Sequence, residues 1–269
     1  MASCIEFEKE LMECLTATGL LQGDNIYVTG NIGALGRIRI NKSLKMDLLL
    51  KAFQNNIGTE GTIFSPSASM NLCNTRTPFD VNDTPSYQMG AFAEYFRKLP
   101  NSVRSNHPFW SISGLGPESN RLKRVSRHAY GVGSPWSIML GLNTTQINMG
   151  IHPSKAVTLV HHLETVVGVP YRYTKEFVHP IVNGKEITEE PFYQSVMYSD
   201  SSIRKRLLLN EHFFHDLNSK GLLNEVEHSL GLRFWSFKMT DFYGIALDYF
   251  IDDIYTYLEK PPSIRPYQQ

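Results

Sequence analysis

The sequence predicts a single mixed α/β domain over residues 1–269, with a largely parallel central sheet covered by helices and an antiparallel C-terminal part. Helical and strand patterns alternate as far as Pro170, and this order implies parallel pairing. Beyond Pro170 the pattern changes to strands around an Asn183-Gly184 turn, which favours an antiparallel hairpin. No internal repeat or linker interrupts the chain, so one continuous domain is expected.

Helices are predicted where apolar residues recur three or four positions apart. The first follows the capping box Ser3–Glu6 and places Leu11 and Leu15 on one face. The second places Leu48 and Phe53 inward in the same way. The expected helices span residues 3–19, 43–56, 87–98, 118–127, 135–142, 155–167, 202–220 and 240–258.

Short β-prone runs between these helices predict the strands. The expected strands span residues 25–29, 61–65, 146–149, 171–182, 192–198 and 226–238. Residues 65–84, in contrast, are rich in Ser, Asn, Thr, Pro and Asp and show almost no periodicity. A loop of this length inside a compact domain is usually functional.

The charge balance narrows the possible classes of function. With 26 basic and 26 acidic side chains the formal net charge is zero, which argues against nucleic acid or a membrane surface as a partner. The first residues do not form a secretory signal, and no apolar stretch is long enough to cross a bilayer. The three cysteines, Cys4, Cys14 and Cys73, lack metal-ligand spacing, so a cytoplasmic protein is expected.

Three polar residues on one predicted helix carry the clearest chemical signal. Thr158, His161 and Glu164 recur every third position and therefore share one face of the helix at 155–167. A histidine can accept a proton near neutral pH, and a carboxylate one turn away can orient it and stabilise its charged form. The same spacing also fits a solvated helix face. A metal site is a weaker alternative, because the spacing matches no known zinc pattern, and no metal is expected.

An ordered series of residues around this helix completes a family pattern. The series consists of Phe79-Asp80, Pro85-Ser86, Gly90, Glu94, Phe96-Arg97, Pro100, the run from Arg104 to Ser111, Gly116, Gly133-Ser134-Pro135, Gly150, the Thr158/His161/Glu164 trio and Arg172. In this order it closely resembles the aminoglycoside 3-N-acetyltransferase family, also called the antibiotic N-acetyltransferase family. The resemblance runs from about Gly23 to Arg172. It implies a fold distinct from that of the common acetyltransferase superfamily.

The resemblance implies an enzyme that transfers an acetyl group from acetyl-CoA to an amine of an amino sugar. By the same resemblance His161 is the general base, Glu164 orients it, and Thr158 lines the site. Direct attack of the amine on the thioester is expected, since the chain lacks a Gly-x-Ser-x-Gly nucleophile signature. The residues expected at the coenzyme site are Asn31, Arg104, Ser105, His107, Ser111 and Ser134.

Two further features concern the coenzyme. The family's first loop usually reads His-Ser-Ser-Leu, whereas this chain has Thr29-Gly30-Asn31-Ile32, which removes two hydroxyl donors. Asn31 retains hydrogen-bonding groups, so the loop is still expected to contact the coenzyme. The densest basic cluster could hold the coenzyme phosphates or could be a solvated helix face. This cluster consists of Arg121, Lys123, Arg124 and Arg127.

The identity of the acceptor is the more open question. Residues 1–172 are expected to hold the coenzyme and the catalytic groups, and residues 173–269 to face the acceptor. Aminoglycosides are polycations, so their site should present carboxylates. The candidates are Asp80, Glu94, Asp241 and Asp248, the last two of which also fit a solvated helix face.

The neutral chain leaves two alternatives to an aminoglycoside acetyltransferase. One is an enzyme that acetylates a nucleotide-linked amino sugar for a surface polysaccharide such as O-antigen. The other is a non-catalytic coenzyme A-binding protein. The neutral surface and the aromatic residues are also compatible with a homodimer.

Overall fold

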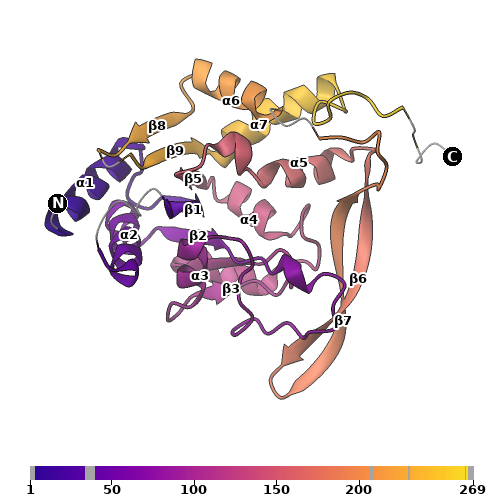
Figure 1. Ribbon diagram of the computed structural model, residues 1–269, viewed down its shortest axis with the longest axis horizontal. Coiled ribbons are helices and arrows are strands. Elements are labelled where there is room, and N and C mark those ends of the chain that lie inside the picture. The colour runs from indigo at the N-terminus through magenta and orange to yellow at the C-terminus, as the bar shows by residue number, and fades with distance from the viewer. Residues whose placement is uncertain (1–3, 34–39, 206–208, 230, 264, 266–269) are drawn as a thin grey trace.

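A computed structural model describes residues 4–33, 40–205, 209–229, 231–263 and 265 (Figure 1). Within these residues the central sheet has seven strands in the order β3-β4-β2-β1-β5-β9-β8. The strands are β1 (Asn25–Gly30), β2 (Thr62–Pro66), β3 (Val103–Arg104), β4 (Ile112–Leu115), β5 (Thr145–Met149), β8 (Asn224–Glu227) and β9 (Arg233–Lys238). A second, two-stranded sheet is formed by β6 (Arg172–Asn183) and β7 (Glu186–Met197).

The middle of the central sheet is parallel. β1 pairs in parallel with β2 on one side and with β5 on the other, which confirms the predicted parallel centre. β9 and β8 add antiparallel strands beyond β5, as predicted for the C-terminal part. Antiparallel pairing also extends to the opposite edge, where β4 and β3 follow β2. These two strands were not expected from the sequence, because each is too short to show a pattern.

Helices cover both faces of the sheet, as the strand and helix order predicts. The helices are α1 (Cys4–Ala17), α2 (Lys42–Ile57), α3 (Ala91–Arg97), α4 (Pro135–Gly141), α5 (Leu159–Val167), α6 (Leu209–Ser219) and α7 (Met239–Asp252). Ile26 and Val28 of β1 pack into a core with α1, α2 and α3. Tyr27 packs into a second core with α4, α5, α6 and α7. Successive side chains of a strand point to opposite faces, so β1 is buried on both sides.

The β6–β7 hairpin runs along one side of the body and extends beyond it (Figure 1). The predicted turn is present, and Gly184 adopts a positive φ of 64° there. Phe79 forms a β-bridge with Ile181 and His128 one with Tyr193, so the hairpin is fastened to the long loops of the body. A small core that includes Phe79 and Ile181 fills the space between them.

Several helix boundaries differ from those predicted. α3 begins at Ala91 instead of residue 87, because Gly90 has a φ of 96° that no helix allows. Residues 117–124 form a 3₁₀ helix, η3 (Pro117–Arg124), in place of an α-helix. Residues 153–155 form the separate 3₁₀ turn η4 (Pro153–Lys155), so α5 begins only at Leu159. α7 ends at Asp252, and the predicted cap Ser3 lies outside the described residues.

No helix in the described part of the chain is both long and apolar enough to span a membrane.

Candidate active site

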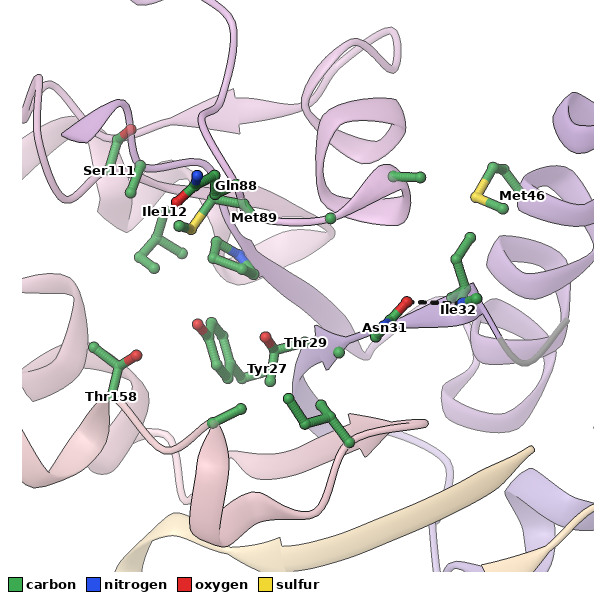
Figure 2. Close-up of a pocket in the computed structure, with 18 of the residues that line it drawn as sticks. Tyr27, Thr29, Asn31, Ile32, Met46, Gln88, Met89, Ser111, Ile112 and Thr158 are labelled. Carbon is green, nitrogen blue, oxygen red and sulfur yellow. Dashed lines mark hydrogen bonds between the residues drawn. The ribbon is translucent and has the colours of Figure 1, made fainter. Parts of the chain in front are cut away.

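A cavity of about 780 Å³ opens where the parallel strands of the sheet end (Figure 2). Thr29 and Gly30 of β1 and Pro66 of β2 form part of its wall, at the carboxyl ends of their strands. Ligands of open α/β sheets bind at this edge. The described residues that line the cavity are Tyr27, Thr29, Gly30, Asn31, Ile32, Gly33, Lys42, Lys45, Met46, Pro66, Ala68, Gln88, Met89, Gly90, Ala91, Trp110, Ser111, Ile112, Trp136, Ile151, Ala156 and Thr158.

The cavity wall is mostly apolar and carries charge at one place. Among the lining residues that the structure describes, the only charged side chains are Lys42 and Lys45. Both lie in the first turn of α2, whose N-terminal end carries a partial positive charge. In Figure 2 Met46 of the same helix lies at one side of the cavity and Thr158 at the opposite side. The cavity therefore suits a largely uncharged chain that ends in a phosphate.

The loop after β1 is shaped by a close approach of two backbones. A Cβ atom on Gly30 would lie 2.1 Å from the carbonyl oxygen of Met149, so this position requires glycine. The next amide, Asn31 N, donates to that same oxygen at 2.7 Å. Oδ1 of Asn31 accepts a hydrogen bond from Gly33 N at 2.8 Å. Asn31 thus lines the cavity, as predicted, and its side chain also holds the loop in place.

Ser111 also lines the cavity, whereas Arg104 lies buried behind it. Arg104 Nε donates to Ser111 Oγ at 2.9 Å, and its two terminal nitrogens donate to the carbonyl oxygens of Thr84 and Ser67 at 2.6 and 2.5 Å. The guanidinium is therefore already engaged by the protein. Arg104 connects the loop of residues 67–84 to the cavity wall, and the contact with the coenzyme that the resemblance implies stays a prediction.

Three other predicted coenzyme residues also have structural partners and do not line the cavity. Ser105 Oγ accepts from Ile112 N at 2.9 Å. His107, also buried, accepts from the amides of Phe109 and Trp110 through Nδ1. Ser134 caps the N-terminus of α4 and donates to Gly131 O at 2.7 Å. Each side chain therefore binds the local backbone, and its role at the coenzyme site stays a prediction.

The predicted catalytic trio comes together at the start of α5. Thr158 precedes this helix and lines the cavity, and its side chain does not cap the helix. His161 lies one turn further along, with Nδ1 2.7 Å from Oε2 of the fully buried Glu164. Arg172 Nε lies 2.9 Å from the same carboxylate oxygen, and Tyr171 donates to Oε1 at 2.9 Å. Arg172 and Tyr171 therefore fix the position of the carboxylate, and the carboxylate orients the imidazole of His161.

The charge states of this pair follow from burial and from each other. Burial lowers the pKa of His161 below its ordinary value, although Glu164 acts in the opposite direction. Burial also tends to raise the pKa of Glu164, but His161 and Arg172 outweigh it and hold that pKa below its usual range. At neutral pH the pair is a neutral imidazole and a carboxylate. Because a carboxylate only accepts hydrogen bonds, Nδ1 carries the proton and Nε2 is free to accept one.

Aromatic residues that the sequence did not single out surround His161. The ring of Tyr130 lies 5.8 Å from the imidazole and that of Tyr257 6.0 Å, both edge-on. Tyr130 also contacts Trp136 of the cavity wall at 6.4 Å and so connects the cavity with His161. Tyr130 lies just before the Gly133-Ser134-Pro135 motif, which was its one available signal. Nothing in the local sequence marks Tyr257.

The four acidic residues predicted for the acceptor do not line the cavity. Asp80 accepts the amides of Asn82 and Asp83 in a turn. Glu94 pairs with Arg97 at 2.7 Å and accepts from the amide of Ser86 at 2.8 Å. Burial would raise the pKa of Glu94, but these partners hold it well below its usual range. Both carboxylates have partners within the protein and lie outside the cavity wall, so their contact with an acceptor stays a prediction.

The acidic stripe on α7 and the basic cluster also lie outside the cavity wall. Asp248 is exposed and Asp241 half-buried on α7, as the alternative of a solvated helix face predicts. In the basic cluster, Arg121 pairs with Glu118 on η3 and Arg127 with Glu190 on β7. Within the described residues, no group of three His, Cys, Asp or Glu side chains could hold a metal ion.

Comparisons with known proteins identify the family of this chain. The family profile described as "Aminoglycoside 3-N-acetyltransferase" matches residues 32–250. "Aminoglycoside N(3)-acetyltransferase VII" of Streptomyces paromomycinus is 25% identical over 201 residues, which are 64% of this chain and 65% of that protein. The "SPbeta prophage-derived aminoglycoside N(3')-acetyltransferase-like protein YokD" of Bacillus subtilis (strain 168) is 25% identical over 146 residues, 47% of this chain and 52% of that protein. These alignments span less than two thirds of the curated relatives.

The fold of this chain also matches that of a solved structure. The structure described as "AAC-IIIb binary with CoASH" superposes with a TM-score of 0.77 at 17% identity and covers 97% of this chain and 99% of its own. At that identity the likeness shows the fold alone, and it confirms the fold expected from the resemblance. The chain belongs to the aminoglycoside 3-N-acetyltransferase family.

Proposed function

We propose that this chain transfers an acetyl group from acetyl-CoA to an amine of an amino sugar. The observation that carries the proposal is the pair of His161 and Glu164, 2.7 Å apart, one helical turn from the residue that lines the end of the cavity. A neutral imidazole with a buried carboxylate behind it is the arrangement expected of a general base. Membership in the family supports the same reaction.

The cavity fits the chemistry of a coenzyme A thioester. Its apolar wall suits the pantetheine chain, and Lys42 and Lys45 at the start of α2 suit the phosphates. The "CoASH" in the description of the structural neighbour supports this use of the fold. These lysines replace the basic cluster of residues 121–127 as the candidates for the phosphates.

In this proposal His161 Nε2 removes a proton from the acceptor amine while the amine nitrogen bonds to the thioester carbon. The carbon–sulfur bond breaks, and the coenzyme leaves as a thiolate that takes up a proton. Glu164 stabilises the imidazolium formed in between, and Arg172 keeps Glu164 ionised. No covalent bond to the protein is required.

Two buried donors, one in the cavity wall and one beside His161, suit the oxygen of the thioester, which gains negative charge during the attack. Nε1 of Trp136 and the hydroxyl of Tyr130 have no hydrogen-bond partner within the residues that the structure describes. Trp136 lines the cavity and Tyr130 lies between Trp136 and His161. Burial raises the pKa of Tyr130 well above its ordinary value, so its hydroxyl stays protonated and can donate.

The test is thiol release from acetyl-CoA, followed with a colorimetric reagent in the presence of amino sugars. Turnover that depends on both the acceptor and His161 supports the proposal. Calorimetry with coenzyme A separates the alternative of a non-catalytic binding protein, for which coenzyme binds without any turnover. Turnover that persists in the His161→Ala variant contradicts the assignment of the base.

A further inference from the structure

Three successive residues of β7 lie against the proposed catalytic residues. The carbonyl oxygen of Ser195 accepts from a terminal nitrogen of Arg172 at 3.0 Å, and that of Tyr193 accepts from Ala129 N at 2.9 Å. Arg172 is the partner of the proposed catalytic carboxylate, and residue 129 directly precedes the tyrosine proposed to donate to the thioester oxygen. Gln194 lies between these two contacts, so its backbone is fixed beside the site.

The side chain of Gln194 joins two other segments of the chain. It is buried, its Oε1 accepts from Nε1 of Trp110 at 3.1 Å, and its Nε2 donates to Sγ of Cys73 at 3.7 Å. A thiol sulfur is a weak acceptor, so the bond to the indole is the stronger of the two. A buried amide with these partners adds little stability, because an apolar side chain of the same length needs neither bond. Stability alone therefore does not explain a glutamine at this position.

Trp110 connects this glutamine with the site. Its ring lines the cavity and lies 5.6 Å from the ring of Tyr130, which in turn lies 5.8 Å from the imidazole of His161. The buried hydroxyl of Tyr130 has no hydrogen-bond partner within the residues that the structure describes. No bond of its own orients this hydroxyl, so its direction depends on the rings that pack around Tyr130. A fixed indole plane at Trp110 therefore helps to fix the direction of the hydroxyl.

We propose that Gln194 is a positioning residue for acetyl transfer. By accepting from Nε1 of Trp110 it fixes the indole, and the indole holds the Tyr130 ring so that its hydroxyl can donate to the thioester oxygen. The inference rests on the proposed function and extends the set of residues that serve it. Gln194 does not itself line the cavity, as far as the described residues show. Because a donor to developing charge must be placed closely, a small shift of the ring slows the reaction without weakening coenzyme binding.

The first test replaces the acceptor of the indole bond. Thiol release from acetyl-CoA is measured with kanamycin, glucosamine and UDP-glucosamine, and the acceptor that turns over fastest is used for all variants. Gln194→Met should lower kcat by about tenfold while KM for acetyl-CoA changes less than about twofold. Thermal stability should stay close to that of the parent protein, since the half-buried Trp110 can turn its N–H toward solvent.

Two further variants separate the ends of the amide. Gln194→Glu keeps an oxygen for the indole and should restore most of the kcat that Gln194→Met loses. Cys73→Ala is the matched control, because it removes the other partner of the amide and leaves the bond to Trp110 in place. This control should leave kcat nearly unchanged.

A double-mutant cycle tests whether Gln194 acts through Tyr130. If it does, Gln194→Met should lower kcat by less than about twofold when Tyr130→Phe is already present, against about tenfold in the parent protein. The acid limb of kcat/KM, which reports on His161, should not move in Gln194→Met. Losses that multiply in the double variant mean that the two residues act independently, which overturns the inference.

Failure of the inference and failure of the proposed function have different signatures. An unchanged kcat in Gln194→Met, a rise in KM for acetyl-CoA alone, or an equal loss in Cys73→Ala overturns the positioning role and leaves the acetyl transfer standing. The same holds if loss of folded protein accounts for the whole fall in activity. No transfer by the parent protein to any of the acceptors overturns the proposed function itself, and this role with it.

Discussion

Oε2 of Glu164 lies 2.7 Å from Nδ1 of His161 and 2.9 Å from Nε of Arg172, so one buried carboxylate oxygen faces the imidazole and a permanent cation together. Arg172 keeps Glu164 ionised as the pH falls, and Glu164 in turn keeps the proton of His161 on Nδ1. The tautomer of His161 is thus set by a chain of contacts that does not depend on the acceptor.

His161→Ala should lower kcat by about 10²-fold or more while the affinity for coenzyme A stays unchanged, because the imidazole accepts a proton and does not line the cavity. Steady-state thiol release and calorimetry measure the two effects. The neighbouring His162 is the control: it is buried, and its Nδ1 accepts from Gly131 N at 3.1 Å. His162→Gln should reduce thermal stability and leave kcat per folded molecule within a few fold, and a kcat loss matching that of His161→Ala would contradict the assignment.

Glu164→Gln should change the pH dependence of the reaction as well as its rate. The neutral imidazole is the active form, so activity is lost as the pH falls through the pKa of His161. Since Glu164 raises that pKa against the effect of burial, its removal shifts the acid limb of kcat/KM to lower pH. At neutral pH kcat should fall by about 10²-fold because Nδ1 is no longer oriented. An acid limb that moves to higher pH would be the wrong sign for this pair.

Lys42→Ala and Lys45→Ala should each raise KM for acetyl-CoA by about three- to tenfold and weaken its dependence on salt, with kcat little changed. The reason is their place in the first turn of α2, where they line the cavity. Acetyl-N-acetylcysteamine, a truncated thioester without phosphates, provides the comparison. If the variants affect the truncated thioester equally, the lysines do not contact phosphate.

Tyr130→Phe should lower kcat by about tenfold or more without shifting the acid limb that reports on His161, because it removes one donor to the thioester oxygen and leaves the ring in place. Tyr243→Phe on α7, whose ring lies 6.3 Å from that of His162, is the matched substitution and should have no such effect. Equal kinetics for the two variants would remove Tyr130 from the mechanism.

Arg104→Met should destabilise the fold by on the order of 3 kcal/mol, because several charge-assisted hydrogen bonds are lost, Thr84 O loses its guanidinium donor, and Ser67 O keeps only the hydroxyl of Ser111. Urea unfolding measures the free energy. For the folded fraction, KM for acetyl-CoA should change less than in the lysine variants. A large rise in KM at unchanged stability would restore the direct coenzyme contact that the resemblance implied.

The features that the sequence predicted depend on contacts between residues close together in the chain. Those it did not predict depend on contacts between residues far apart in the chain. His161 and Glu164 are three residues apart on one helix, so helix geometry alone brings them together, and the Asn183-Gly184 turn is equally local. The buried position of Arg104 could not be predicted, because residue type says nothing about burial. Its partners, Ser67 and Thr84, lie in a loop without periodicity.

The aromatic surroundings of His161 were harder still to predict. Tyr257 contacts His161 beside a β-bridge between residues 205 and 258, and no periodicity in the sequence indicates such a pairing. The strands β3 and β4 were missed for a related reason, since each is defined by its neighbours in the sheet more than by its own residues.

The contact between Tyr257 and His161 also ties the appearance of activity to folding. Thr29 of the cavity wall and Tyr257 are more than two hundred positions apart, so loops of great length must close before both stand at the same site. The proposed turnover therefore requires contacts of long sequence separation, which slow folding. A cut between α7 and Tyr257 would remove the ring beside His161 and leave α7 in the core that it shares with Tyr27 and Trp136 of the cavity wall. The proposed turnover would then report whether the last described residues of the chain had assembled.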